Sequence, residues 1–221
     1  MNESTIQVTG TGSIHVVPDV TRLTVSIKRH FASYKLSFES AKENSAWFVK
    51  ILEYNHQPGQ LAKTVWFDIS DHQTPQYDED GNYLGSVADG YDLNQRVQID
   101  FGIDNVLVNN VVRGIGKFIV GAQINIGYTV RDPRPIQLKM LERAVKDAKE
   151  KATIMATAAG RELGNVTNIE YGELHDSLSV YSQARNIHDN AEASASTASS
   201  LDITPEDLVM SDKVNVSWSL K

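Results

Sequence analysis

The sequence predicts an α+β fold, in which an antiparallel or mixed sheet packs against a long helix of the C-terminal half and against shorter helices. Several stretches alternate apolar and polar residues, as half-buried strands do. Other stretches repeat apolar residues every three or four positions, as amphipathic helices do. The two kinds of stretch mix without the strict strand–helix alternation of a doubly wound parallel sheet, which favours the α+β class.

Strands open the chain. The alternation predicts one strand over residues 4–9 and a second over 13–29, separated by the segment Gly10-Thr11-Gly12. We expect the second strand to bend near Pro18, because proline cannot donate to a ladder hydrogen bond. A helical period then covers residues 33–56.

A projecting β-hairpin is predicted over residues 71–90. The strand that leads into it covers 61–70, and the strand that leaves it begins at Tyr91. Between them lies the pair Asp80-Gly81, which is typical of a tight turn because glycine adopts positive φ without a steric penalty.

The second half contains two helices. Asp104 or Asn105 is placed to cap a short one, and a strand then runs to Val130. The longest helix is predicted over 135–163, with Gly164 as its left-handed cap. Its buried face is expected to carry Leu138, Leu141, Val145, Ala148, Ala152, Met155, Ala159 and Leu163.

A row of alanines marks one edge of this long helix, at positions 144, 148, 152 and 156. Small side chains allow a helix to approach another element closely, and alanine has the highest helix propensity. We expect this row to pack on the sheet of the same chain. A contact between subunits is the alternative.

Residues 182–204 are rich in serine and alanine, and a final strand is predicted over 212–220. Small polar side chains bury too little apolar area to offset the entropy of ordering, so we expect a mobile loop over 182–204. The whole chain, residues 1–221, is predicted to form one domain.

Composition excludes several functions. The 221 residues contain no cysteine, which excludes disulfides, thiolate zinc sites and a cysteine nucleophile. A net charge of −7 argues against a nucleic-acid binder or an anionic-membrane binder, since both need a basic face. No stretch reaches the roughly 18 consecutive apolar residues of a membrane span.

The motifs of known catalytic and binding sites do not occur. The segments Gly10-Thr11-Gly12 and 113–117 lack the spacing of a phosphate-binding loop, and the acidic segment 78–82 lacks the register of an EF-hand, although weak calcium binding there stays an alternative. No serine lies in a Gly-x-Ser-x-Gly elbow. Six histidines show no spacing typical of metal ligands; they are His15, His30, His56, His72, His175 and His188. We therefore assign no catalytic, cofactor-binding or metal-binding residue, and expect a protein that is not an enzyme.

Aromatic residues gather around the predicted hairpin. Tyr77, Tyr83 and Tyr91 bracket it, and Trp66 precedes it. Packing in the core explains such residues in most proteins. An interface is the alternative, because tyrosine and tryptophan are enriched at protein contacts. These four residues are our candidate interface.

Four segments together resemble one bacterial family. The first joins Val8-Thr9-Gly10-Thr11-Gly12 to Pro18-Asp19-Val20-Thr21-Arg22-Leu23, and the second joins the tyrosine-bearing hairpin to Gly90-Tyr91. The third is Asp132-Pro133, and the fourth runs from Ala144 through the alanine-rich helix to Leu163-Gly164-Asn165-Val166. In this order and spacing the segments resemble the SIMPL domain family, over about residues 5–220.

The resemblance implies an α+β protein that assembles into homo-oligomers, sometimes ring-like, and that is linked to stress responses. It implies the periplasm or cell envelope, whereas the cytoplasm is expected if Met1 is the native start. It supplies no catalytic residue. We therefore expect a non-enzymatic oligomeric scaffold, with a binding module for a partner protein or small ligand as the first alternative and an unrecognised hydrolase as the second.

Overall fold

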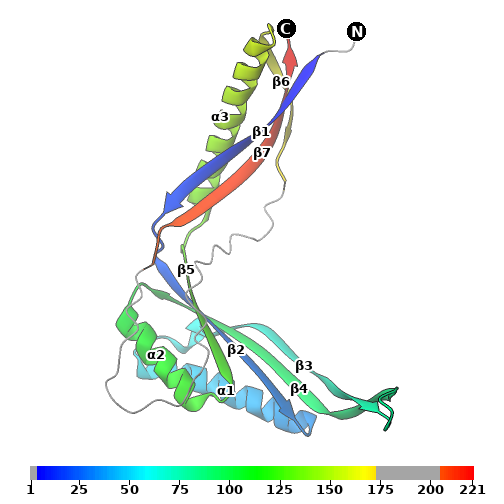
Figure 1. Cartoon of the computed structure of the whole chain (residues 1–221). Coiled ribbons are helices and arrows are strands. Elements are labelled where there is room, and N and C mark those ends of the chain that lie inside the picture. Colours follow the sequence, from blue (N-terminus) through cyan, green and yellow to red (C-terminus); the bar gives the residue numbers. More distant parts are fainter. Residues whose placement is uncertain (1–3, 173–204) are drawn as a thin grey trace. The chain divides into compact units, whose positions relative to one another are not determined.

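The computed structural model describes residues 4–172 and 205–221, which fall into two compact units (Figure 1). The first comprises residues 4–19, 128–172 and 205–221, and the second comprises residues 20–127. Each unit combines an antiparallel sheet with at least one α-helix, which confirms the α+β class. One domain over 1–221 stays a prediction, and the loop predicted over 182–204 lies outside the described residues.

The first unit is a three-stranded antiparallel sheet covered by one helix. The strand order is β1-β7-β6, and the long helix packs against β1 and β7. Its elements are β1 (Thr5–Val16), α3 (Arg134–Ala158), β6 (Leu163–Glu170) and β7 (Leu208–Leu220). The apolar cluster between sheet and helix includes Val8, Val214, Val216 and Trp218.

The alanine row of α3 lies on this sheet, as expected. Ala144, Ala148 and Ala152 are fully buried, and Ala156 is nearly so. The broader face predicted for the helix was partly wrong, because Leu138 is 59% exposed and Met155 is 52% exposed. The helix is turned so that its smallest side chains, together with Met140, face the strands.

Strand β1 runs unbroken through Gly10 and Gly12, so the predicted interruption there was wrong. The two glycines lie directly under α3. A Cβ at Gly10 would collide with the carbonyl oxygen of Ala144, and a Cβ at Gly12 with the carbonyl oxygen of Met140. Here glycine permits close approach of the helix backbone, whereas we expected it to end a strand.

The end of α3 also differs from the prediction. The helix ends at Ala158, and Gly160 supplies the left-handed residue with φ of 69°. The Arg161 amide donates to the carbonyl of Ala156 and closes the last turn. Gly164 is not the cap, because it lies inside β6 against Ser219.

The second unit is a four-stranded sheet with two α-helices. The strand order is β3-β4-β2-β5. Its elements are β2 (Val20–Phe31), α1 (Tyr34–Tyr54), the short 3-10 helix η1 (Gly59–Leu61), β3 (Lys63–Tyr77), β4 (Tyr83–Gly102), α2 (Asn105–Phe118) and β5 (Ala122–Thr129). Helix α1 packs against β2, β3 and β4 and also contacts α2.

Strand alternation gives the sheet of this second unit two distinct faces. Odd-numbered residues in the central part of β2 and β4, such as Leu23, Val25 and Ile99, are fully buried. Even-numbered residues of the same strands, such as His30 and Asp92, point to the opposite, solvent-accessible side, which we call the outer face.

Candidate functional site

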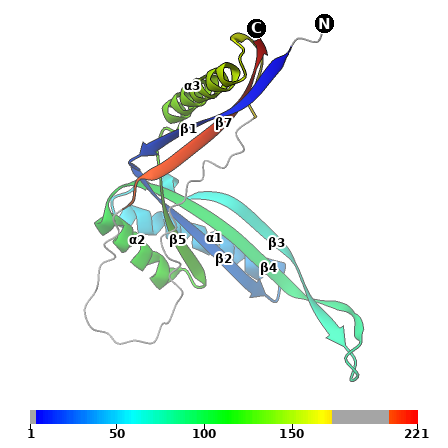
Figure 2. The same cartoon turned by 45° about the horizontal axis from the view of Figure 1, so that its top comes forward.

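The most conspicuous part of the second unit is a two-stranded arm, which we define as residues 73–88. Strand β2 ends at Phe31 opposite Tyr91, so beyond this point, among the strands that the structure describes, β3 and β4 pair only with each other. Figures 1 and 2 show this hairpin running past the end of β2. Almost every residue of the arm is exposed, so the arm buries little within its own chain.

Asp78 organises the turn at the end of the arm. Its Oδ1 accepts hydrogen bonds from the amides of Asp80 and Asn82, at 3.0 and 2.8 Å, and its Oδ2 accepts one from the Asn82 side chain at 3.0 Å. The side-chain and backbone hydrogen bonds from Asn82 lower the pKa of Asp78 below its ordinary value. The Asp78 carboxylate is therefore ionised at neutral pH, and Glu79 and Asp80 stand exposed beside it.

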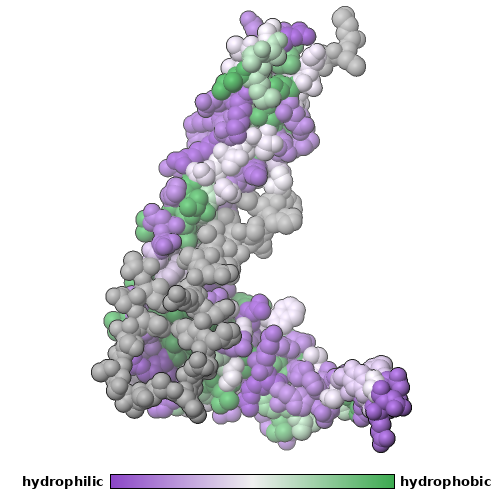
Figure 3. Space-filling model, in the orientation of Figure 1, coloured by the Kyte–Doolittle hydropathy of each residue, from purple (hydrophilic) through white to green (hydrophobic). Residues whose placement is uncertain are grey.

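The four predicted interface residues lie in two different environments. Tyr77 and Tyr83 face each other across the arm with ring centroids 5.9 Å apart, and both are about 60% exposed. Trp66 is 61% exposed on β3. Tyr91 is less accessible and packs edge-on against Tyr34 of α1. In Figure 3 the end of the arm is hydrophilic, with paler residues immediately behind it.

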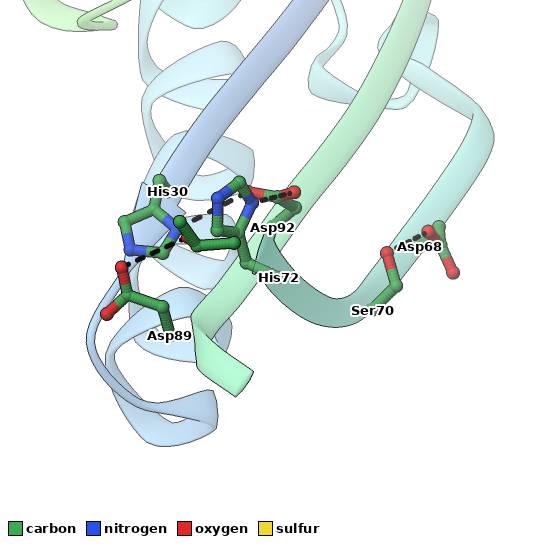
Figure 4. A network of polar contacts seen from close by, with 7 residues as sticks. His30, Asp68, Ser70, His72, Asp89 and Asp92 are labelled. Carbon is green, nitrogen blue, oxygen red and sulfur yellow. Dashed lines mark hydrogen bonds and ion pairs between the residues drawn. The ribbon is translucent and has the colours of Figure 1, made fainter. Parts of the chain in front are cut away.

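Three side chains meet where the arm leaves the sheet, and we call them the histidine cluster: His30, His72 and Asp92 (Figure 4). Asp92 Oδ2 lies 2.8 Å from His72 Nδ1, and Asp92 Oδ1 lies 3.4 Å from His30 Nδ1. The two imidazole rings are 4.6 Å apart between centroids, in an edge-on arrangement. The side chains keep 45%, 38% and 39% of their surface, in the order His30, His72, Asp92.

Strand register explains how the histidine cluster forms. His30 and Asp92 are directly paired across β2 and β4, so their side chains share the outer face. Ser70 of β3 pairs with Asp92, and His72, two residues further along β3, lies on the same face beside it. The register shift follows at His72, which lies opposite two residues of β4, Asp89 and Gly90. Gly90 leaves room for the cluster, since a Cβ there would lie 2.7 Å from Cε1 of His30.

Sequence reasoning missed this cluster. His30, His72 and Asp92 are separated by 20 residues or more, and no metal-ligand spacing joins them. The signal available in the sequence was that His30 directly follows the strand predicted over 13–29, His72 lies in the hairpin predicted over 71–90, and Asp92 lies at the start of the next strand. The hydrogen bond between Asp92 and His72 lowers the pKa of the Asp92 carboxyl, and desolvation partly opposes this shift.

A groove of about 680 Å³ lies between α1 and α2. We call it the helix groove; its lining residues are Trp47, Lys50, Ile51, Tyr54, Asn55, Asn110, Arg113, Gly114, Lys117 and Phe118. None of these described residues is acidic, and three carry a positive charge. The helices approach closely at Gly114, where a Cβ would lie 2.9 Å from the Ile51 side chain.

Aromatic and cationic groups are layered in the helix groove. Trp47 and Phe118 are stacked with centroids 4.3 Å apart and planes 8° from parallel. The Lys50 ammonium lies 4.7 Å from the Trp47 ring centroid, and the Lys117 ammonium 5.2 Å from that of Phe118. Such cation–aromatic pairs hold two positive charges over apolar ring surface, and both lysines stay exposed to solvent.

A comparison with known families places the whole fold in one of them. Residues 6–218 match the model of the SIMPL family, described as a protein of unknown function (DUF541), and so both units are covered. The chain belongs to the SIMPL family. The resemblance proposed from the sequence motifs is thereby confirmed.

The curated relatives that the chain matches are likewise described as uncharacterized. The chain is 25% identical over 167 residues to an uncharacterized protein, YggE, of Escherichia coli K12. Equivalent matches are to YggE of Escherichia coli O157:H7 and of Shigella flexneri. The alignment covers 75% of this chain and 65% of the relative, a little under two thirds of that protein. None of the described helices is long and apolar enough to cross a membrane.

Proposed function

We propose that this protein is a non-enzymatic scaffold that assembles with further copies of itself, the arm of one copy docking in the helix groove of the next. The observation that carries the proposal is the arm. It extends beyond the sheet and leaves Tyr77 and Tyr83 about 60% exposed. A two-stranded hairpin is marginally stable by itself, so a partner that packs on it would stabilise it.

Charge complementarity selects the helix groove as the acceptor. The arm ends in three consecutive acidic residues, Asp78, Glu79 and Asp80, whereas the groove presents Lys50, Arg113 and Lys117. Both surfaces also expose aromatic rings, which are favoured at the centre of protein contacts. A second copy brings both complementary surfaces, so the chain needs no other partner for this contact.

The arm and the groove are different surfaces, so their contact is heterologous. A heterologous contact produces a closed ring if the rotation between copies closes, and an open filament if it does not. The opposite charges at the contact also predict that assembly weakens as salt is added, because exposed charges are screened.

The test reverses the charges of the arm or of the helix groove and measures the mass of the resulting particle by light scattering as the protein elutes. The wild-type chain is expected above the 24.5 kDa of one copy. Reversing the arm (Glu79→Lys with Asp80→Lys) or the groove (Lys50→Glu with Lys117→Glu) should each reduce the particle mass to that of one chain. A mixture of the two reversed proteins should assemble again with the two chains alternating, since the basic arm of one fits the acidic groove of the other and the unchanged arm and groove also fit each other. Lys42→Glu, on the same helix α1 but outside the groove, is the matched control and should assemble normally.

Two outcomes contradict the proposal. If the wild-type protein has the mass of a single chain at every concentration, the proposal that copies assemble is wrong. Reversed proteins that remain in the assembled state, or that fail to associate when mixed, would remove the helix groove as the acceptor.

The helix groove also supports a second candidate function, the binding of a small anion. Its three cations and stacked rings would suit a ligand with a negative group and a flat apolar part. A single-chain wild type whose thermal stability rises with an aromatic phosphate ester, but not in the Lys50→Glu and Lys117→Glu variant, would favour this function over assembly.

A further inference from the structure

We propose that the histidine cluster is a binding site for a divalent transition metal ion, with zinc as the reference ion. The donor set is two imidazole nitrogens and one carboxylate, from His30, His72 and Asp92, and their candidate ligand atoms all lie within 4.8 Å of one another. The proposal is independent of the arm contact proposed above, since it rests on different side chains.

The spacing of the donor atoms is close to what zinc needs. Zinc bonds to nitrogen or oxygen of about 2.0–2.1 Å place two ligands of a tetrahedral site roughly 3.3 Å apart. Asp92 Oδ2 lies 2.8 Å from His72 Nδ1, and Asp92 Oδ1 lies 3.4 Å from His30 Nδ1, on either side of that value. With one ligand atom from each residue, all three lie within 4.8 Å of one another, so side-chain rotations need only draw them together around one ion.

The three ligands are held by backbone structure rather than by flexible loops. They come from β2, β3 and β4, three adjacent strands of one sheet. His30 and Asp92 are fixed by their direct pairing, and His72 by its place two residues after Ser70, the partner of Asp92 on β3. The hydrogen bonds that now join both rings to Asp92 hold the donors on the same side, so binding needs little reorganisation.

The chemistry of the donors selects the class of metal. Imidazole nitrogen suits zinc, copper, nickel and iron, whereas calcium and magnesium prefer sites made entirely of oxygen. Two histidines and one carboxylate leave at least one coordination position for water, and all three side chains are partly accessible to solvent. An ion bound here would tie together the three strands at the point where the arm leaves the sheet.

The experiment titrates zinc into the full chain, without a histidine tag, in competition with a chromophoric zinc chelator. We expect one high-affinity zinc ion per chain. His30→Ala, His72→Ala and Asp92→Asn should each weaken binding at least tenfold, and magnesium or calcium at millimolar concentration should not compete. His15→Ala is the matched control, because His15 is an exposed strand histidine outside the cluster, and it should bind zinc as the wild type does.

A measurement on the unaltered chain guards against variants that fail to fold. Diethyl pyrocarbonate modifies accessible histidines, and mass spectrometry locates the modified sites. Zinc should protect His30 and His72 and leave the modification of His15 unchanged. Absence of zinc binding by the wild type, affinity unchanged by His30→Ala and His72→Ala, or protection that extends equally to His15 would each overturn the proposal.

Discussion

Replacement of Gly10 by alanine tests the closest contact in the first unit, that between β1 and α3. The added Cβ would lie 2.6 Å from the backbone nitrogen of Ala148 and 2.7 Å from its Cβ, and the carbonyl oxygen of Ala144 is nearer still. Real Cβ atoms essentially never approach other heavy atoms within 3.0 Å. Since the obstacles include helix backbone, which cannot rotate away as a side chain can, α3 must move off the strand.

The expected loss in the free energy of unfolding follows from this displacement of α3. A separation of about 0.5–1 Å removes roughly a quarter to a half of the dispersion energy between the atoms that move apart. Overpacking of a core by one methyl group typically costs about 1–3 kcal/mol. We expect the upper end, about 3 kcal/mol, because the whole alanine row of α3 loses contact with the sheet. Without the collision, alanine would stabilise a strand by about 0.5–1 kcal/mol relative to glycine, so the helix reverses the sign of the effect.

Urea unfolding followed by circular dichroism measures the change. A denaturant slope of about 1–3 kcal/mol per molar converts a 3 kcal/mol loss into a midpoint lowered by about 1–3 M. Gly116→Ala in α2 is the control, since nothing lies within 4 Å of its added Cβ, and it should stabilise by up to about 1 kcal/mol. If Gly10→Ala unfolds at the same urea concentration as the wild type or later, the close packing of α3 on β1 is wrong.

Three further predictions concern single polar side chains. The Lys151 hydrogen bond lowers the pKa of Asp147, so the stability that this carboxylate contributes is present above its unfolded pKa and is lost as the pH falls through its folded pKa. Asp147→Asn should therefore unfold at lower urea than the wild type at pH 7 and at nearly equal urea at pH 2; an equal gap at both would contradict the assignment. Gln95→Leu removes the partner of the buried Asn44 amide and should cost about 1–3 kcal/mol in urea unfolding, whereas no loss would show that Asn44 is satisfied elsewhere. Asp104→Ala removes the cap that accepts from the Leu107 amide at 3.0 Å and should cost about 1 kcal/mol, while Asp104→Asn should retain most of the stability; equal loss in both would argue against capping.

Local sequence patterns predicted the secondary structure well where one face of an element is buried. The period of two over β2 and β4, and the cap Asp104, are properties of neighbouring residues, so they can be read without knowledge of the fold. The tight turn at Asp80-Gly81 is equally local, and the structure gives Gly81 the positive φ that it needs.

The predictions from the sequence were wrong where the role of a residue depends on contact with a segment far away in the chain. Gly10 and Gly12 have the local signature of a strand break, yet their role is to admit α3, a helix more than 120 residues later. The buried face of α3 was predicted mainly from its large apolar residues. In the structure its alanines face the strands, because glycine on β1 and alanine on α3 together allow the two backbones to approach.

The sequence by itself determined the family, the α+β class and the position of the hairpin, because these depend on motif order, periodicity and turn chemistry along the chain. Only the tertiary structure decided which polar residues meet. The register of three paired strands brings His30, His72 and Asp92 together, and helix packing brings Lys50 and Lys117 to one groove. Such groupings depend on pairing between segments far apart in the chain, a geometry that no local pattern of residue types records.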